Sequence, residues 1–148
     1  MLLAACGSAT TDTEVLPQPP MSFALLAPAD GACVAIGTEV TARIPIQFAA
    51  NNVLLRTVGA CGSNGNCGSL KLRAGAVDNN QGASLVVDLL LGKLANPYHD
   101  GAPHPGTGKP NVLPIEASLL AENGASLLDV NGTPLTLTFG LIIKPSCP

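Results

Sequence analysis

The stretch VTARIPIQF, residues 40–48, places Val, Ala, Ile, Ile and Phe at the even positions and Thr, Arg, Pro and Gln between them. Successive side chains of a β-strand point to opposite faces, so this period of two predicts a strand with one buried face. Proline has no N–H group to give to a neighbouring strand. Pro45 therefore predicts an edge strand or a β-bulge at that position.

The same period of two recurs at residues 70–74 and 135–143. The apolar run at residues 85–91, which is interrupted by Asp88, indicates a further strand that is buried. Together with 16 glycines and 13 prolines, which favour turns, these patterns predict an all-β chain. We expect an antiparallel β-sandwich of about seven to nine short strands, with almost no helix.

One segment, residues 114–122, fits two structures. It could form a short helix, with proline in the first turn and glycine just past the end. Its side chains also alternate in character, as in a strand. The Asn123-Gly124 pair that follows is a strong β-hairpin signal, and a second such pair occurs at Asn131-Gly132. These pairs favour the strand.

The first residues of the chain predict a place in the cell. The tetrapeptide LAAC, residues 3–6, matches a bacterial lipobox, in which the cysteine becomes lipid-modified. A signal peptide needs an apolar stretch of roughly 7 to 15 residues, so we expect this start to lie inside a longer reading frame. Residues 1–6 would then end a signal peptide, 7–20 would form a disordered polar tether, and 21–148 would form the folded domain. Lipid on Cys6, followed by Gly7 rather than aspartate, predicts an outer-membrane or cell-surface lipoprotein.

The remaining cysteines predict disulfides. If Cys6 carries lipid, an even number is left, which in an exported chain allows three connectivities of two bridges. Cys61 and Cys67 flank a flexible Gly- and Asn-rich loop, while Cys33 and Cys147 lie at the two ends of the domain. We favour one disulfide between Cys61 and Cys67 and one between Cys33 and Cys147. The spacing of five residues between Cys61 and Cys67 is typical of neither a zinc site nor a redox pair.

Composition excludes several partners. With 7 basic and 10 acidic residues the net charge is −3, and no Lys/Arg cluster marks a nucleic-acid surface. No apolar run approaches the 18 or so residues of a transmembrane helix. We therefore expect membrane contact only through the lipid, and no nucleic-acid partner.

Chemistry-bearing motifs are few. Two histidines and a carboxylate, His99, Asp100 and His104, share the long loop at residues 96–112, and such groups can bind copper or zinc. The glycines and prolines of this loop equally describe a plain solvated connection, which we favour. The segments 78–81 and 129–132 offer oxygen ligands for calcium but lack EF-hand spacing. Without a recognisable catalytic motif, we expect neither an enzyme nor a cofactor.

Several residues together resemble the Ig-like domains of secreted bacterial lipoproteins, especially those of myxobacterial type. The similarity spans most of residues 27–144, and its motifs are loose and structural. It implies an Ig-like sandwich. The positions where such domains tend to carry histidines hold Ser69, Lys71 and Pro114 here, so no histidine-dependent role is implied. The resemblance rests on Phe48, Asn51, Leu54, Gly59, Cys61, Cys67-Gly68, Leu70, Leu72, Ile115-Glu116-Ala117-Ser118-Leu119 and Asn123-Gly124.

These observations lead to two hypotheses on function. The first is a lipid-anchored extracytoplasmic Ig-like domain with a structural, adhesion or protein-interaction role at the cell envelope. The second is a metal- or carbohydrate-binding module that uses the 96–112 loop. Aromatic residues, which often form sugar-binding platforms, are only 3% of the chain, and this favours the first hypothesis.

Overall fold

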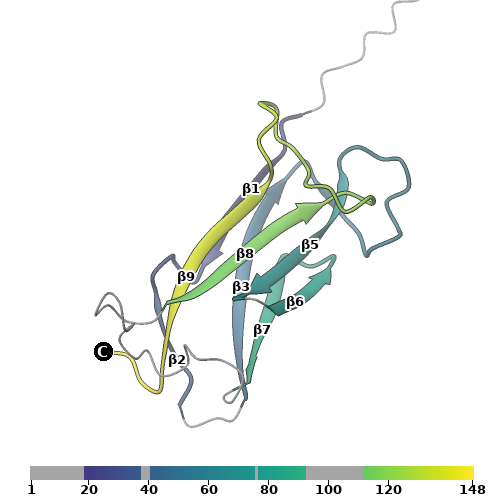
Figure 1. The fold of residues 1–148 in the computed structure, drawn as a ribbon. Helices are drawn as coiled ribbons and strands as arrows, with labels where there is room; N and C mark the ends of the chain where they lie inside the picture. Colours follow the sequence, from purple (N-terminus) through teal and green to yellow (C-terminus); the bar gives the residue numbers. More distant parts are fainter. Residues whose placement is uncertain (1–18, 38–40, 76, 93–111) are drawn as a thin grey trace, which may run out of the picture.

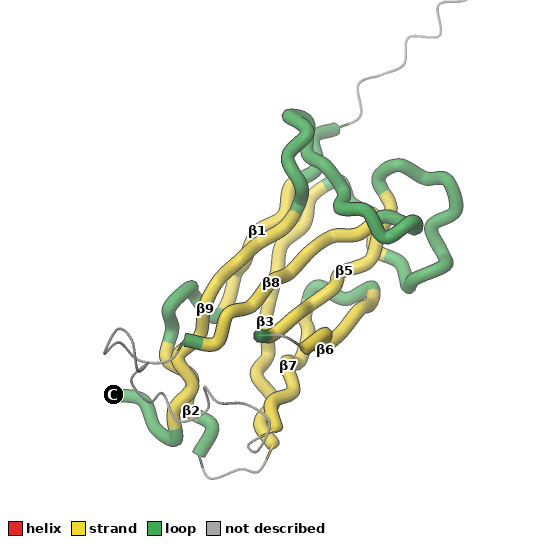
Figure 2. Tube along the Cα trace, in the orientation of Figure 1, coloured by secondary structure: helices red, strands yellow, loops and turns green. Residues whose placement is uncertain are grey.

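The computed structural model describes residues 19–37, 41–75, 77–92 and 112–148. All regular elements in these residues are strands, as Figure 2 shows, so the prediction of an all-β chain is confirmed. The described residues include no helix long and apolar enough to cross a membrane. The strands are β1 (Ser22–Ala27), β2 (Cys33–Ala35), β3 (Thr41–Asn51), β4 (Leu54–Leu55), β5 (Cys67–Ala74), β6 (Val77–Gly82), β7 (Val86–Gly92), β8 (Leu113–Leu120) and β9 (Thr136–Lys144).

The strands form two sheets that face each other (Figure 1). One sheet has the order β1-β3-β7, and the other has the order β2-β9-β8-β5-β4, with β6 also paired to β5. Neither sheet is built from one continuous part of the sequence. The predicted all-β sandwich is therefore confirmed as a fold class.

Two short pairings depart from the purely antiparallel sheet that we predicted. β2 runs parallel to β9, with Cys33 opposite Ile142, and β4 runs parallel to β5, with Leu54 opposite Cys67. Strand β2 is only three residues long and strand β4 only two. Strands this short carry too little alternation to be recognised, which is why the sequence pattern missed them.

The core lies between the two sheets and is built from the inward positions of each strand. Three phenylalanine rings connect the layers, because Phe48 of β3 lies 5.2 Å from Phe23 of β1 and 6.2 Å from Phe139 of β9, measured between ring centroids. The pair of Phe48 and Phe139 is edge-to-face, an arrangement in which aromatic rings attract one another beyond their shared burial. The largest fully buried side chains are Ile46, Leu70, Leu72, Leu89, Ile115, Leu119, Leu141, Ile143 and Cys67.

Pro45 lies in the middle strand of its sheet, and its pairing with β7 continues without a register shift. The prediction of an edge strand or a β-bulge is therefore wrong for β3 as a whole. The N–H of Phe48 donates to the carbonyl of Leu85, on the β7 side, at 2.9 Å. Because successive N–H groups of a strand point to opposite sides, the nitrogen of Pro45 faces the side of β1. Pairing with β1 ends at Gln47. Pro45 thus lies beyond the last residue of β3 that pairs with β1, so its missing N–H group costs no hydrogen bond to that strand.

The apolar run at residues 85–91 forms β7, but it is not the buried strand that we predicted. Val87 and Leu89 are buried, whereas Val86 and Leu90 are 55% and 51% exposed. Asp88, between them, lies 3.7 Å from the guanidinium group of Arg43 on the same outer face. β7 is therefore half-buried, because the described residues cover only one face of the three-stranded sheet.

The ambiguous segment at residues 114–122 is a strand, as its alternation favoured. β8 pairs with β5 and β9 on its two sides. Both Asn-Gly pairs form tight turns after it: the N–H of Ala121 donates to Ala125 across the first, and that of Asp129 donates to Thr133 across the second. A strand with two neighbours pairs its backbone groups on both sides, whereas a short helix would leave the N–H groups of its first turn and the C=O groups of its last turn without intrahelical partners.

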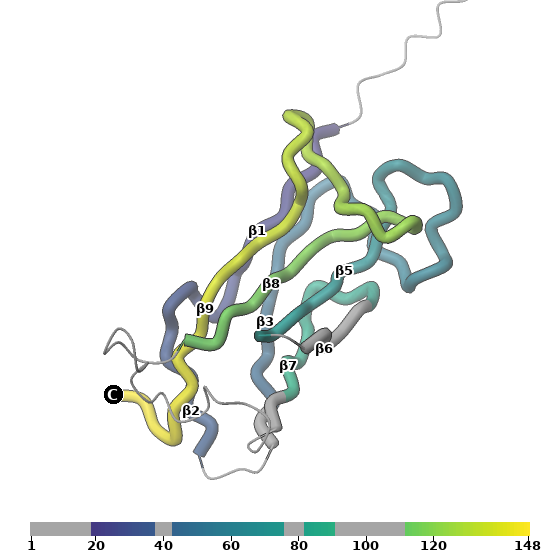
Figure 3. The backbone as a smooth tube through the Cα atoms, viewed as in Figure 1, coloured from purple at the N-terminus to yellow at the C-terminus, as the bar shows by residue number. Residues whose placement is uncertain are grey.

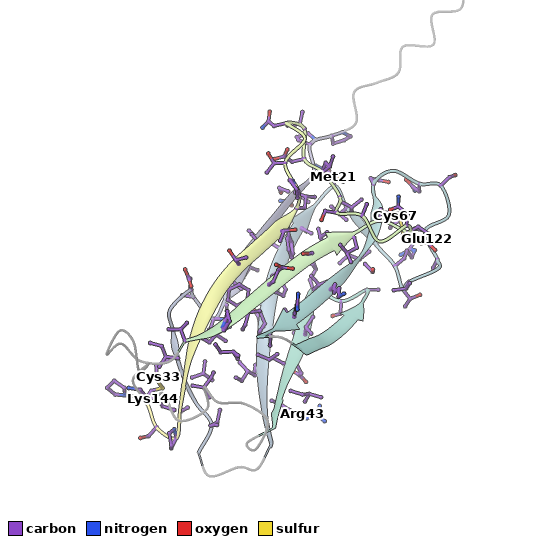
Figure 4. All side chains as sticks on the ribbon, viewed as in Figure 1. Met21, Cys33, Arg43, Cys67, Glu122 and Lys144 are labelled. Carbon is purple, nitrogen blue, oxygen red and sulfur yellow. A yellow bond between two sulfur atoms is a disulfide. The ribbon has the colours of Figure 1, made fainter. Side chains whose placement is uncertain are left out.

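The domain has one disulfide between distant parts of the chain and one that closes a short loop. Cys33 of β2 is bonded to Cys147 beyond β9, and Cys61 is bonded to Cys67 at the start of β5. These are the two pairs that the sequence favoured. Figure 4 places Cys33 and Cys67 at opposite ends of the sandwich, so each end carries one covalent link.

A single carboxylate ties the β1–β2 connection to the second sheet. The N–H of Gly140, a buried residue of β9, donates to Oδ1 of Asp30 at 2.8 Å. We expect Asp30→Ala to lower the free energy of unfolding by about 2 kcal/mol, because the buried N–H loses its partner. Asp30→Asn keeps an acceptor oxygen and should cost less than half as much. Urea unfolding of both variants tests this, and equal stability of Asp30→Ala and wild type would contradict it.

Candidate binding site

A hollow lies on the outer face of the six-stranded sheet, and we call it the polar hollow. It encloses about 230 Å³. Strands β5 and β8 form its floor, and the turn after β8 forms one wall. Outward side chains of adjacent strands stand opposite each other here, as Lys71 does to Ser118 and Arg73 to Glu116. The polar hollow is lined by Lys71, Arg73, Glu116, Ser118, Leu120, Gly124 and Ser126.

The floor of the polar hollow contains a buried hydroxyl group. Ser118 is only 7% exposed, and its Oγ lies 3.1 Å from Oγ1 of Thr136 on β9. When Thr136 donates in this hydrogen bond, the proton of Ser118 remains available to a molecule in the hollow. Ser69, one pair further along β5, is also a buried polar residue, at 5% exposure. Polar side chains are thus held in fixed positions by the sheet.

Charge in the polar hollow is mixed. Lys71 and Arg73 can only donate hydrogen bonds and carry positive charge, while the carboxylate of Glu116 can only accept. The lining side chains therefore have a formal net charge of +1, in a chain whose total is −3. The polar hollow is therefore suited to bind a ligand that has both an anionic group and hydrogen-bond donors.

The turn that walls the polar hollow is fastened to a neighbouring loop. Oε2 of Glu122 accepts a hydrogen bond from the N–H of Cys61 at 3.2 Å, and Cys61 belongs to the disulfide loop before β5. Figures 3 and 4 show this loop beside the turn after β8, with Cys67 and Glu122 at the same end of the molecule. The wall is therefore held by the disulfide loop as well as by the sheet.

The loops at this end also expose apolar side chains. Val58, in the disulfide-linked loop, is 61% exposed, and Val130, in the second turn after β8, is 77% exposed. We call these two segments, residues 56–66 and 121–135, the loop end.

Several residues that the sequence singled out lie outside the described residues: Cys6, His99, Asp100 and His104. The structure does describe Asp129, which we considered as a calcium ligand. Its Oδ1 accepts hydrogen bonds from the N–H groups of Asn131 and Thr133, at 2.8 and 2.9 Å, so this oxygen stabilises a turn. Within the described part of the chain, no three His, Cys, Asp or Glu side chains are grouped so as to hold a metal ion.

Sequence reasoning did not find the polar hollow. Lys71 and Arg73 appear in the sequence only as the polar positions of a half-buried strand, as do Glu116 and Ser118. What makes them a site is the pairing of β5 with β8 and the return of the chain at the Asn123-Gly124 turn. The only sequence signal is that both strands carry polar outward positions close to a predicted turn.

Comparison of the chain with protein-family models, with curated proteins and with solved structures finds no match.

Proposed function

We propose that this chain is a lipid-anchored extracytoplasmic Ig-like domain with an adhesion or protein-interaction role at the cell envelope. The proposal combines a cellular location, which the lipobox at residues 3–6 predicts, with a binding surface made of the polar hollow and the loop end. The proposal also includes the resemblance to Ig-like domains of secreted bacterial lipoproteins, of which the two-sheet strand order supports the sandwich architecture. A sandwich fold alone serves many functions, so the argument rests on particular features.

The two disulfides support the extracytoplasmic location. Disulfides persist in oxidising compartments and are rare in the reducing cytosol. Four of the five cysteines of the chain form these bonds, and the fifth is Cys6 in the lipobox. This division of roles is what an exported, lipid-anchored domain requires.

The observation that carries the interaction role is the construction of the loop end. The Cys61–Cys67 disulfide ties the first loop to the start of β5, and the hydrogen bond from Cys61 to Glu122 joins this loop to the second, while Val58 and Val130 remain exposed. Loops held in place lose little conformational entropy when they bind, which favours affinity. Exposed aliphatic side chains on such loops are suited to contact with a protein partner.

Lipid anchoring is tested with Cys6→Ala in the full-length precursor. We expect this variant to leave the membrane fraction and appear in the soluble extracytoplasmic fraction, because the thioether-linked lipid is the only membrane attachment we propose. The control is Cys61→Ala with Cys67→Ala, which also replaces cysteines but removes a disulfide of the folded domain, and should leave the protein in the membrane fraction. Unchanged membrane partition of Cys6→Ala would refute the anchor.

The interaction role is tested on the purified domain with cells of the same species. We expect wild-type protein to bind the cell envelope saturably and Val58→Asp with Val130→Asp to bind at least about tenfold more weakly, since charges at a buried interface position are costly. Leu26→Asp is the control, because Leu26 is 62% exposed on the other sheet. Equal binding of the loop variant and the control would overturn the assignment of the loop end.

A further inference from the structure

We infer that the polar hollow binds one sugar unit that carries a carboxylate, as part of an acidic glycan. The inference rests on the proposed envelope role and names a ligand for it. It also moves any carbohydrate site away from the 96–112 loop and onto the outer face of β5 and β8.

The size of the polar hollow limits the ligand. Sites for drug-sized molecules usually measure about 300 to 1,000 Å³, whereas this one encloses about 230 Å³. It therefore accommodates a single ring with its substituents. Because the hollow lies on a sheet face, the neighbouring units of a longer glycan can continue past it.

The side chains of the polar hollow select the chemistry. A carboxylate fits the two cationic groups of Lys71 and Arg73, since charge-assisted hydrogen bonds of this kind are the strong ones. The carboxylate of Glu116 would repel a ligand that is only an anion, but it accepts hydrogen bonds from hydroxyl groups. A ligand with both kinds of group can form hydrogen bonds with the cationic side chains and with the carboxylate of Glu116.

The serines favour the same ligand. Hydroxyl groups both donate and accept, so Ser118 in the floor and Ser126 in the wall can match sugar hydroxyls in either direction. Leu120 and Gly124 give the hollow a small apolar side, which suits the C–H face of a sugar ring. The lining includes no aromatic ring, so binding depends on the polar groups and their charge.

The experiment is an NMR titration of the domain, residues 21–148 with both disulfides intact, at low salt with three probes. Trigalacturonate offers carboxylates and hydroxyls, its methyl ester offers the hydroxyls alone, and propane-1,2,3-tricarboxylate offers carboxylates alone. We expect saturable shifts of the Lys71, Ser118 and Ser126 amide signals. Trigalacturonate should bind about tenfold more tightly than either of the other probes, because each of them lacks one set of hydrogen bonds.

Variants locate the site and separate the two kinds of contact. Lys71→Ala with Arg73→Ala should weaken trigalacturonate binding at least about tenfold. Arg43→Ala removes the same kind of charge from the outer face of the other sheet, where Arg43 is 74% exposed, and should leave binding unchanged. Glu116→Gln should weaken trigalacturonate binding but strengthen tricarboxylate binding. Ser126→Ala provides a second test if the double variant does not fold.

Two results would overturn the inference. One is equal affinity for trigalacturonate and the tricarboxylate, which would describe a simple anion site. The other is the absence of saturable shifts at β5 and β8 up to roughly 10 mM trigalacturonate, a concentration beyond weak millimolar binding. The anchoring test with Cys6→Ala is independent of both results. If trigalacturonate does not bind, the proposed membrane location is still decided by the Cys6→Ala experiment alone.

Discussion

Replacing Cys33 and Cys147 together by alanine is expected to lower the free energy of unfolding by about 5 kcal/mol, against about 2.4 kcal/mol for Cys61 and Cys67. A disulfide restricts the unfolded chain, and the restriction grows with the length of the closed loop. The two bridges close loops with sequence separations of 114 and 6 residues. Since domains are stable by only about 5 to 15 kcal/mol, loss of the longer bridge should bring the domain close to unfolding.

Urea unfolding followed by far-ultraviolet circular dichroism measures both losses. The chain has no tryptophan, so fluorescence is a poor probe. Alanine at position 67 also removes a side chain that is only 2% exposed, which adds to the cost of the shorter bridge. Reduction of the wild-type protein opens both bridges and keeps every side chain. It therefore separates the loss of the disulfides from the loss of the buried Cys67 side chain. A smaller loss for Cys33 and Cys147 than for Cys61 and Cys67 would contradict the loop-length argument.

The sequence predicted the long strands because each carries its own pattern. The alternation extends to Phe48 in β3 and over the first part of β9, and Ile44, Ile46 and Phe48 are buried where it places them. The turn at Asn123-Gly124 could also be predicted, because that pair of residues has a local conformational preference. These features depend on neighbours in the chain.

Features that depend on distant contacts were missed or mistaken. The outer face of β7 looked buried because Val86 and Leu90 are apolar, and nothing local says that a sheet face is left uncovered. Pro45 indicated an edge strand, yet β3 is a central strand. It tolerates a proline there because its pairing with β1 ends at Gln47. The polar hollow needs both the β5–β8 register and the folded-back turn, and neither is encoded in one segment.

Gly68→Ala is expected to lower the free energy of unfolding by about 3 kcal/mol. Gly68 is a buried residue of β5, and a Cβ atom there would lie 2.5 Å from the carbonyl oxygen of Leu120 and 2.8 Å from Cδ1 of Leu127. Leu127 can rotate away, but the carbonyl belongs to the end of β8, where Leu120 pairs with Ser69. Relief of the clash therefore requires the two strands to move apart.

Gly65→Ala is the matched control, because a Cβ atom at Gly65, in the disulfide loop just before β5, meets nothing within 4 Å. It should change stability by no more than about 0.5 kcal/mol. Combining Gly68→Ala with Leu127→Ala identifies the atom responsible: if the backbone carbonyl dominates, Gly68→Ala costs the same in both backgrounds. Since Leu120 also lines the polar hollow, the same displacement should weaken trigalacturonate binding in Gly68→Ala and leave it unchanged in Gly65→Ala. Equal urea midpoints for the two glycine variants would show that β5 and β8 have room at this position.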